Sequence, residues 1–291
     1  MRLFDEDGPV LFDSALGTAL LAAGQPKGTG SEEMNEISPE TVLGIHLENV
    51  KAGSDVISSN SFGVSQMMFR GERERGLTLL EKSVALAINA ASGGGHGGRD
   101  VFACLSIGPT GAMLGSSGDA GYDDVRDIYA AQAEAGERAG ADFILLETFA
   151  DPEEFVCAAR AARSAADLPV AGTMTFDKNG YSFMGGSAYD LLGIARAENL
   201  VATGANCTLD PFGMLPVIDT LTSLADGFPI IAQPNMGQPV IRDGKAVYET
   251  PDEVFLAGAE KLIDLGVSGI GGCCGTTPVV ISSIRAMIDR R

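Results

Sequence analysis

The chain repeats one pattern eight times: a short apolar run followed by a longer amphipathic segment. This alternation constrains the fold more than any other feature, because apolar runs of this length are typical of parallel strands covered on both faces. The predicted strands are Val10–Asp13, Ser54–Ser59, Val101–Ile107, Asp142–Glu147, Val170–Thr175, Val201–Asn206, Ile230–Gln233 and Gly269–Gly272. The helices predicted after them are Pro39–Ala52, Glu74–Ala91, Asp123–Ala139, Pro152–Ala166, Tyr189–Glu198, Phe212–Ala225, Pro251–Leu265 and Pro278–Asp289.

Eight strand–helix units of about thirty-six residues predict a (β/α)8 TIM barrel that spans residues 1–291 as a single domain. An open doubly wound sheet is the alternative, and it is disfavoured because no Gly-x-Gly-x-x-Gly turn follows the first strand. The low-complexity segment Ser92–Gly98 falls between a helix and the next strand. We therefore expect it to be a flexible connector at the end of the barrel away from the chemistry.

The composition excludes several classes of function. A net charge of −19 argues against binding to nucleic acid, which requires a basic face. There is no uncharged apolar run of roughly eighteen residues and no signal peptide pattern, so neither a membrane span nor secretion is expected. Five cysteines without a dense spacing pattern favour a reducing, cytoplasmic setting over a disulfide scaffold.

Cysteines gather at two predicted strand ends, and the carboxyl ends of the strands carry the active sites of barrel enzymes. Cys273 and Cys274 are adjacent and set in glycine, and Cys207 follows the sixth strand. A disulfide between adjacent cysteines is strained, whereas three thiolates with one open position are the pattern of a catalytic zinc. The sequence therefore predicts a Zn²⁺ site, with three neighbouring core cysteines as the alternative.

The remaining cysteines and both histidines are not expected to bind the metal. Cys104 and Cys157 are predicted to be buried, inert thiols within a strand and a helix. His46, in the first predicted helix, and His96, in the glycine-rich segment, are predicted to be surface residues.

Three thiolates on one divalent ion leave a net charge of −1, which suits binding a substrate thiol better than activating water. The implied chemistry is alkyl transfer to sulfur. Asp13 and Glu147 end two other strands, where paired carboxylates would neutralise the ammonium group of an amino acid. Asn235 ends the seventh strand, and its amide oxygen is predicted to occupy the open zinc position until the substrate thiol displaces it; a turn-forming asparagine is the alternative.

These motifs, taken in order, resemble the homocysteine S-methyltransferase family over nearly the whole chain. The resemblance implies a zinc-bearing barrel that methylates L-homocysteine to methionine, with Cys207, Cys273 and Cys274 as zinc ligands and with Glu147 and Asp13 at the amino group. Ser14 departs from the family motif, which usually has glycine after the aspartate. The matching segments are Asp13–Thr18, Asn60–Gly63, Glu147–Phe149, Ala205–Cys207, Pro234–Gly237 and Gly271–Pro278.

The methyl donor is inferred from two observations. Gly275–Pro278 is most similar to the homocysteine domain of cobalamin-dependent methionine synthase, which implies a methylcobalamin donor carried by a separate corrinoid protein. The chain has no tryptophan, and its tyrosines form no recognisable aromatic box for an onium donor such as betaine. S-methylmethionine or betaine as donor, a corrinoid methyltransferase with another substrate, and a non-catalytic zinc barrel are the alternatives.

Overall fold

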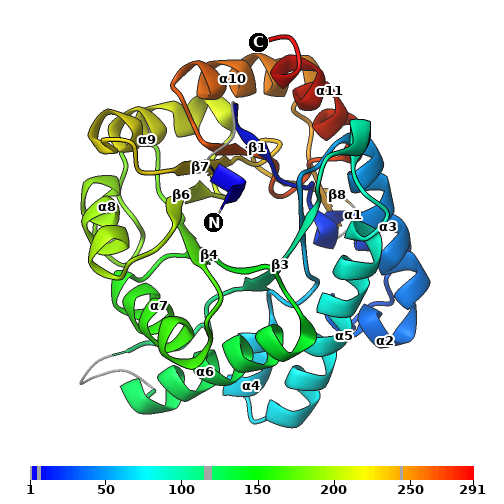
Figure 1. Cartoon of the computed structure of the whole chain (residues 1–291), viewed down its shortest axis with the longest axis vertical. Coiled ribbons are helices and arrows are strands. Elements are labelled where there is room, and N and C mark those ends of the chain that lie inside the picture. Colours follow the sequence, from blue (N-terminus) through cyan, green and yellow to red (C-terminus); the bar gives the residue numbers. More distant parts are fainter. Residues whose placement is uncertain (1, 5–7, 115–119, 243–244) are drawn as a thin grey trace.

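The computed structural model describes residues 2–4, 8–114, 120–242 and 245–291, and it shows a ring of parallel strands surrounded by helices (Figure 1). The strand order is β1-β10-β7-β6-β5-β4-β3-β2, and a parallel bridge between Phe12 and Val56 joins the two edges. The predicted (β/α)8 barrel is therefore confirmed, and an open doubly wound sheet is excluded. The barrel strands are β1 (Val10–Leu11), β2 (Val56–Ser58), β3 (Phe102–Ile107), β4 (Phe143–Phe149), β5 (Val170–Met174), β6 (Ala202–Asn206), β7 (Ile230–Gln233) and β10 (Gly269–Ile270).

The eight predicted helices are all present, and each end lies within one residue of its prediction. They are α3 (Pro39–Ala52), α5 (Arg73–Ala91), α6 (Tyr122–Ala139), α7 (Pro152–Ala165), α8 (Ala188–Ala197), α9 (Pro211–Leu224), α10 (Asp252–Asp264) and α11 (Pro278–Ile288). The structure adds short elements within the loops. These are the 3-10 turns η1 (Arg2–Phe4) and η2 (His96–Gly98), the helices α1 (Leu16–Ala22), α2 (Met34–Ile37) and α4 (Val64–Phe69), and the hairpin β8 (Val240–Arg242) and β9 (Lys245–Val247).

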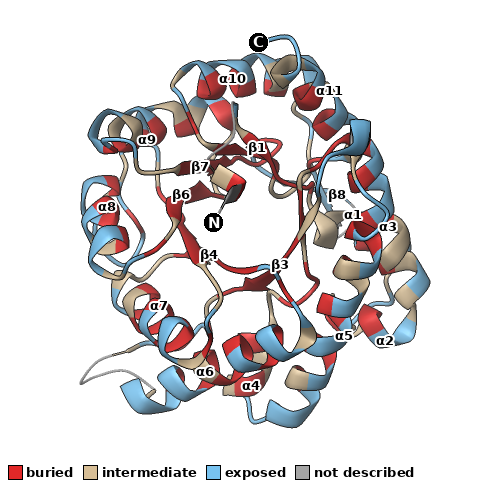
Figure 2. Ribbon diagram, viewed as in Figure 1, coloured by how far each residue is buried: buried red, intermediate tan, exposed pale blue. Residues whose placement is uncertain are grey.

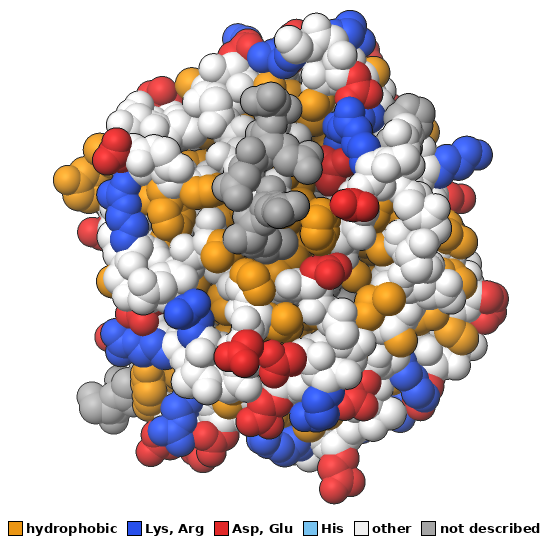
Figure 3. Space-filling model, viewed as in Figure 1, with side chains coloured by type: hydrophobic (Ala, Val, Ile, Leu, Met, Phe, Trp, Pro, Cys, Tyr) orange, Lys and Arg blue, Asp and Glu red, His pale blue; other side chains and the backbone are white. Residues whose placement is uncertain are grey.

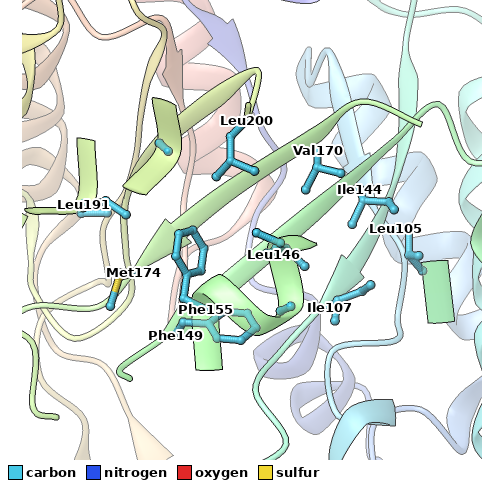
Figure 4. Packing of buried hydrophobic residues seen from close by; sticks show 14 of the residues in the cluster. Leu105, Ile107, Ile144, Leu146, Phe149, Phe155, Val170, Met174, Leu191 and Leu200 are labelled. Atoms are coloured by element: carbon cyan, nitrogen blue, oxygen red, sulfur yellow. The ribbon is translucent and has the colours of Figure 1, made fainter. Parts of the chain in front are cut away.

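Alternate residues of each strand point into and out of the barrel. On β4, Phe143 and Leu145 belong to the interior cluster, whereas Ile144 and Leu146 pack outward against the helices (Figure 4). The strands are consequently buried on both sides, and the helices expose only their outer faces (Figure 2). The η1 turn lies over the middle of the ring in Figure 1, where its Leu3 packs into the interior cluster. Apolar side chains therefore fill the barrel from that end, and its opposite end carries the polar groups described below.

One residue contradicts its prediction. His46 is not on the surface but is 1% exposed, because α1 and α2 pack over α3 with Leu20 and Met34 beside Val42 and Ile45. Burial lowers the pKa of His46 to about 4, so its ring is neutral at physiological pH. The side chain of His96 lies outside the described residues. In the described part of the chain, no helix is long and apolar enough to cross a membrane.

The seam between β1 and β2 is closed by an ion pair between the buried Arg285 and the partly buried Asp55. The Asp55 backbone N–H donates to Leu11 O (2.7 Å), and the Asp55 carboxylate accepts from Leu11 N (2.8 Å). Arg285 of α11 donates to the same carboxylate and to Gly53 O (3.0 Å), and it is only 3% exposed. The last helix is thereby attached to the point where the barrel closes.

On the face of the molecule shown in Figure 3, acidic and basic side chains are interspersed at the surface.

We expect Arg285→Met to lower the free energy of unfolding by about 1.5–3 kcal/mol, because the partly buried Asp55 carboxylate loses a charge-assisted hydrogen bond and is left with Arg99, 4.0 Å away, as its cation. Urea denaturation measures this change. Arg291→Met is the matched control, since Arg291 pairs with Asp264 at the surface and such pairs contribute about 1 kcal/mol or less. Equal effects of the two substitutions would contradict the assigned role of the Arg285–Asp55 pair.

Candidate metal centre and substrate pocket

The structure brings the three predicted cysteines together. The sulfur atoms of Cys207, Cys273 and Cys274 all lie within 4.8 Å of one another, and those of Cys207 and Cys274 are 4.0 Å apart. Cys207 follows β6 and the adjacent pair follows β10, with β7 between these two strands. Because the strands are parallel and in register, their carboxyl ends meet at one edge of the barrel, as the sequence predicted.

The backbone around Cys207 is in a strained conformation. Cys207 and Thr208 both have left-handed φ values, 61° and 59°. Such values are uncommon outside glycine and concentrate at functional sites. The turn is held by a hydrogen bond from Cys207 N to Gln233 O (3.0 Å) and one from Leu209 N to Cys207 O (2.6 Å). The chain therefore turns immediately after β6, at the edge where the sulfur atoms gather.

The adjacent cysteines lie in a glycine loop that leaves no room for other side chains. A Cβ atom at Gly272 would lie 2.2 Å from Thr276 Oγ1, and one at Gly275 would lie 2.3 Å from the Tyr248 ring. Gly275 also has a left-handed φ of 84°. Cys273 N donates to Pro234 O (2.8 Å), which fixes this loop against the end of β7.

The three sulfur atoms fit a tetrahedral metal ion. Sulfur ligands at about 2.3 Å from zinc lie roughly 3.8 Å apart in a tetrahedron. The separation of 4.0 Å between Cys207 and Cys274 is close to this value. Hydrogen bonds from Cys207 and Cys273 lower the pKa of Cys274 to about 3, whereas the hydrogen bonds to Cys207 and Cys274, together with burial, raise the pKa of Cys273 well above its usual range. Three thiolates this close together would repel one another. A divalent cation would offset that repulsion and allow all three cysteines to be deprotonated.

The two predicted carboxylates lie at the same end of the barrel. Asp13 is 4% exposed and accepts hydrogen bonds from Ser58 N (2.8 Å) and Ser58 Oγ (2.9 Å). Glu147 accepts from Ser106 Oγ and from Asn206 Nδ2 (3.3 Å). Burial raises the pKa of each carboxyl to about 7, and the described residues that line the pocket include no Lys or Arg to offset the loss of solvent.

A bulge in β4 brings Thr148 to the pocket beside Glu147, which already points inward by the alternation of the strand. The pairing of β4 with β5 shifts register between Leu146 and Phe149, and Thr148 has a left-handed φ of 63°. Asn206 stabilises this distortion: its Oδ1 accepts from Thr148 N (2.8 Å) and its Nδ2 donates to Thr148 Oγ1 (2.7 Å). As a result Glu147 and Thr148 both face the pocket, while Phe149 packs outward.

One cavity of about 360 Å³ joins the cysteines to the carboxylates. Its lining also contains groups that the sequence analysis missed, above all Ser58, Ser106 and Glu32. The two serines interrupt the apolar pattern of β2 and β3 with inward-facing hydroxyls, and that interruption was the available signal. The lining residues are Asp13–Thr18, Ser31, Glu32, Ser58–Asn60, Phe62, Ser106, Glu147, Thr148, Cys207, Gln233 and Gly272–Cys274.

Two further residues bear on the predicted site. Asn235 does not line the cavity, but it is buried beside the cysteine loop, and its Oδ1 has no hydrogen-bond partner in the described structure. Ser14 does line the cavity; its backbone N donates to Asn49 Oδ1 (2.9 Å) and its buried hydroxyl is unpaired among the described residues. Cys104 and Cys157 are buried away from the cluster, as predicted, and burial raises the pKa of both thiols.

Known proteins are similar to this chain over nearly its whole length. The family model of homocysteine S-methyltransferase matches residues 10–288. The chain belongs to the homocysteine S-methyltransferase family. It is 31% identical over 287 residues to homocysteine S-methyltransferase 2 of Arabidopsis thaliana, covering 87% of this chain and 85% of that protein.

Two further proteins are similar to this chain, one in sequence and one in fold. The methionine synthase of Mycobacterium tuberculosis is 31% identical over 290 residues, which cover 95% of this chain and 24% of that protein. The chain therefore spans about a quarter of that longer enzyme. The metallated form of the homocysteine methyltransferase MmuM from Escherichia coli has the same fold, with a TM-score of 0.79, 24% identity and 98% coverage of both chains.

The buried carboxyls make stability depend on pH. The pKa of Asp13 is raised from 3.8 to about 7, so the folded state binds more protons than the unfolded state between these values. Its contribution to stability is therefore present at low pH and is lost as pH rises through about 7.

We expect Asp13→Asn to stabilise the zinc-free protein relative to wild type at pH 8, and to stabilise it by a smaller amount at pH 5. Urea denaturation at the two pH values measures this difference. Asp123→Asn, at an exposed position, serves as the control; a difference for Asp13→Asn that does not change with pH would contradict the raised pKa.

Proposed function

We propose that this barrel transfers a methyl group to the thiol of L-homocysteine to give methionine, using zinc held by Cys207, Cys273 and Cys274. One observation carries the proposal: a single cavity contains a cluster of three sulfur atoms and two carboxylates, of Asp13 and Glu147. A thiol and an ammonium group on one small molecule match these two features. Family membership supports the same reaction.

The carboxylates would bind the amino group of the substrate. Asp13 and Glu147 have pKa values raised to about 7, and the described lining of the pocket has no cationic side chain. An ammonium group would supply the missing positive charge, lower both pKa values and release protons. The hydroxyls of Ser58 and Ser106 orient the two carboxylates before the substrate arrives. Ala15, Leu16 and Phe62 add apolar lining suited to the methylene groups of homocysteine.

The cysteines would hold the metal. When bound, zinc would keep the substrate sulfur deprotonated at neutral pH and leave it nucleophilic. Asn235 is our candidate for an exchangeable fourth ligand, because its Oδ1 has no hydrogen-bond partner in the described structure. Both of its neighbours are hydrogen-bonded to the cysteine loop: Pro234 O accepts from Cys273 N, and Met236 N donates to Cys274 O (2.9 Å). The close spacing of the three sulfur atoms, all within 4.8 Å of one another, supports the assignment of the metal to the cysteines.

For the methyl donor we propose a methylcorrinoid on a separate protein. In the described lining of the cavity Phe62 is the one aromatic residue, which does not form the cage expected for betaine or another small onium donor. The loops that follow β5 and β7 expose apolar side chains, with Phe183 68% and Ile241 69% exposed. Apolar groups at this end of the barrel suit a large docking partner better than a small donor in a closed pocket.

The metal assignment predicts the behaviour of a cysteine variant. Cys273→Ser should lose most of its zinc, because the hydroxyl is a poor ligand at neutral pH, whereas Cys157→Ser should retain one zinc per chain. Metal analysis of the purified proteins decides this. Full retention of zinc by the Cys273 variant would remove this residue from the site.

The substrate assignment predicts the behaviour of Glu147→Gln. The variant should keep its zinc but bind homocysteine more weakly by about 1.5–3 kcal/mol, because a charge-assisted contact with the ammonium group is lost. Calorimetric titration with homocysteine measures the difference. An unchanged affinity would show that Glu147 does not contact the substrate, and Glu153→Gln on the outer surface of α7 is the control.

The whole proposal is tested by supplying homocysteine with methylcobalamin, betaine or S-methylmethionine in parallel and measuring methionine. We expect zinc-dependent turnover with methylcobalamin. Methionine formation with betaine or S-methylmethionine, but not with methylcobalamin, would overturn the proposed donor and leave the proposed acceptor chemistry intact. No methionine from any donor would contradict the proposed function.

A further inference from the structure

Two adjacent loops line the pocket. The substrate loop, Asp13–Thr18, carries the Asp13 carboxylate and follows β1, and the metal loop, Gly272–Thr276, carries the two adjacent cysteines and follows β10. β1 and β10 are neighbouring strands, with Val10 opposite Gly269 and Leu11 opposite Ile270. The loops that would bind the two ends of one substrate therefore leave the sheet side by side.

The two loops are joined by three hydrogen bonds. Gly272 N donates to Asp13 O (3.2 Å), Gly275 N donates to Thr18 Oγ1 (3.1 Å), and Ala15 N donates to Thr276 Oγ1 (3.2 Å). These bonds run in both directions between the loops. A displacement of one loop therefore breaks bonds to the other.

Thr276 has a special place in this network. Its hydroxyl donates to Cys273 O (2.7 Å) while accepting from Ala15 N, and the residue is 2% exposed. A hydroxyl has one hydrogen, so donation to Cys273 fixes its orientation and aims its lone pairs at Ala15. Gly272 makes this arrangement sterically available, because any Cβ there would collide with the hydroxyl at 2.2 Å. One buried side chain thus connects the backbone of a metal ligand to the backbone of the substrate loop.

We propose that Thr276 is a positioning residue that couples metal binding at the cysteines to amino-acid binding at the substrate loop. The inference rests on the proposed function, which places one end of the substrate at each loop. A metal bound by Cys273 and Cys274 restricts the metal loop. Through the Thr276 hydroxyl it also restricts Ala15, so the entropy lost in ordering the substrate loop is smaller when the amino acid binds. Coupling of this kind is reciprocal: each ligand raises the affinity of the other.

The experiment uses L-norleucine, an amino acid of similar length that has no sulfur and cannot bind the metal through a thiol. Its dissociation constant is measured by calorimetry for the zinc-loaded and the zinc-free protein. We expect zinc to tighten norleucine binding to wild type by about fivefold or more, within the usual range of coupling between sites. In Thr276→Val the ratio of the zinc-free to the zinc-loaded dissociation constant should fall below about twofold, while one zinc per chain is retained.

Two variants separate the hydroxyl from the rest of the residue. Thr276→Ser retains the hydroxyl and should restore the wild-type ratio. Thr277→Val is the matched control, because the neighbouring threonine is exposed and makes no side-chain capping bond to the following helix in the described structure. Hydrogen exchange at the Ala15 amide in wild type gives a second measurement that needs no variant, and we expect zinc to slow it severalfold.

A zinc-independent affinity for norleucine in wild type, undetectable norleucine binding, an unchanged ratio in Thr276→Val, or no effect of zinc on exchange at Ala15 would each overturn the coupling. The proposed reaction is tested apart from this, by methionine formation. A protein that makes methionine but shows no coupling refutes only the role of Thr276. A protein that shows the coupling but makes no methionine refutes only the reaction.

Discussion

The parallel register of β6, β7 and β10 is the constraint on which the site depends. Asn206 lies opposite Gln233, and Ile270 lies opposite Ala232, so the chain leaves β6 and β10 at nearly the same level of the barrel. Glycine at position 204 is required for this packing, since a Cβ there would lie 1.8 Å from Ile231 O. A slip of one residue in either strand would turn the inward-facing side chains outward and separate Cys207 from the other two cysteines.

The electrostatics of the pocket follow from what the barrel buries there. Two carboxyls with pKa values raised to about 7 share a cavity with three sulfur atoms, and the described lining contains no cationic side chain. Such a cavity destabilises the folded chain whenever its acids are ionised, because the negative charges repel one another. A bound cation relieves this repulsion. A metal ion and an ammonium group are both cations. The same unfavourable burial therefore favours binding of the metal and of an amino-acid substrate.

The sequence was sufficient for the parts of the structure that repeat. The barrel strands and the eight outer helices follow from periodicity, and the cysteine cluster and both carboxylates follow from the rule that strand carboxyl ends converge. It was insufficient where tertiary packing decides. His46 was expected at the surface because α1 and α2, which cover it, are too short to have a recognisable period. Ser58, Ser106 and Thr276 were missed because each acts through a hydrogen bond to a residue distant in the sequence.

The central claim is that the three cysteines and the two carboxylates serve one molecule, whose thiol reaches the metal while its amino group is bound. X-ray absorption at the zinc edge, recorded with and without L-homocysteine, tests this most directly because it counts the sulfur atoms around the metal. The account requires three sulfur neighbours in the free protein and four after homocysteine is added, with no such change for L-norleucine. A sulfur count that stays at three with saturating homocysteine would contradict it.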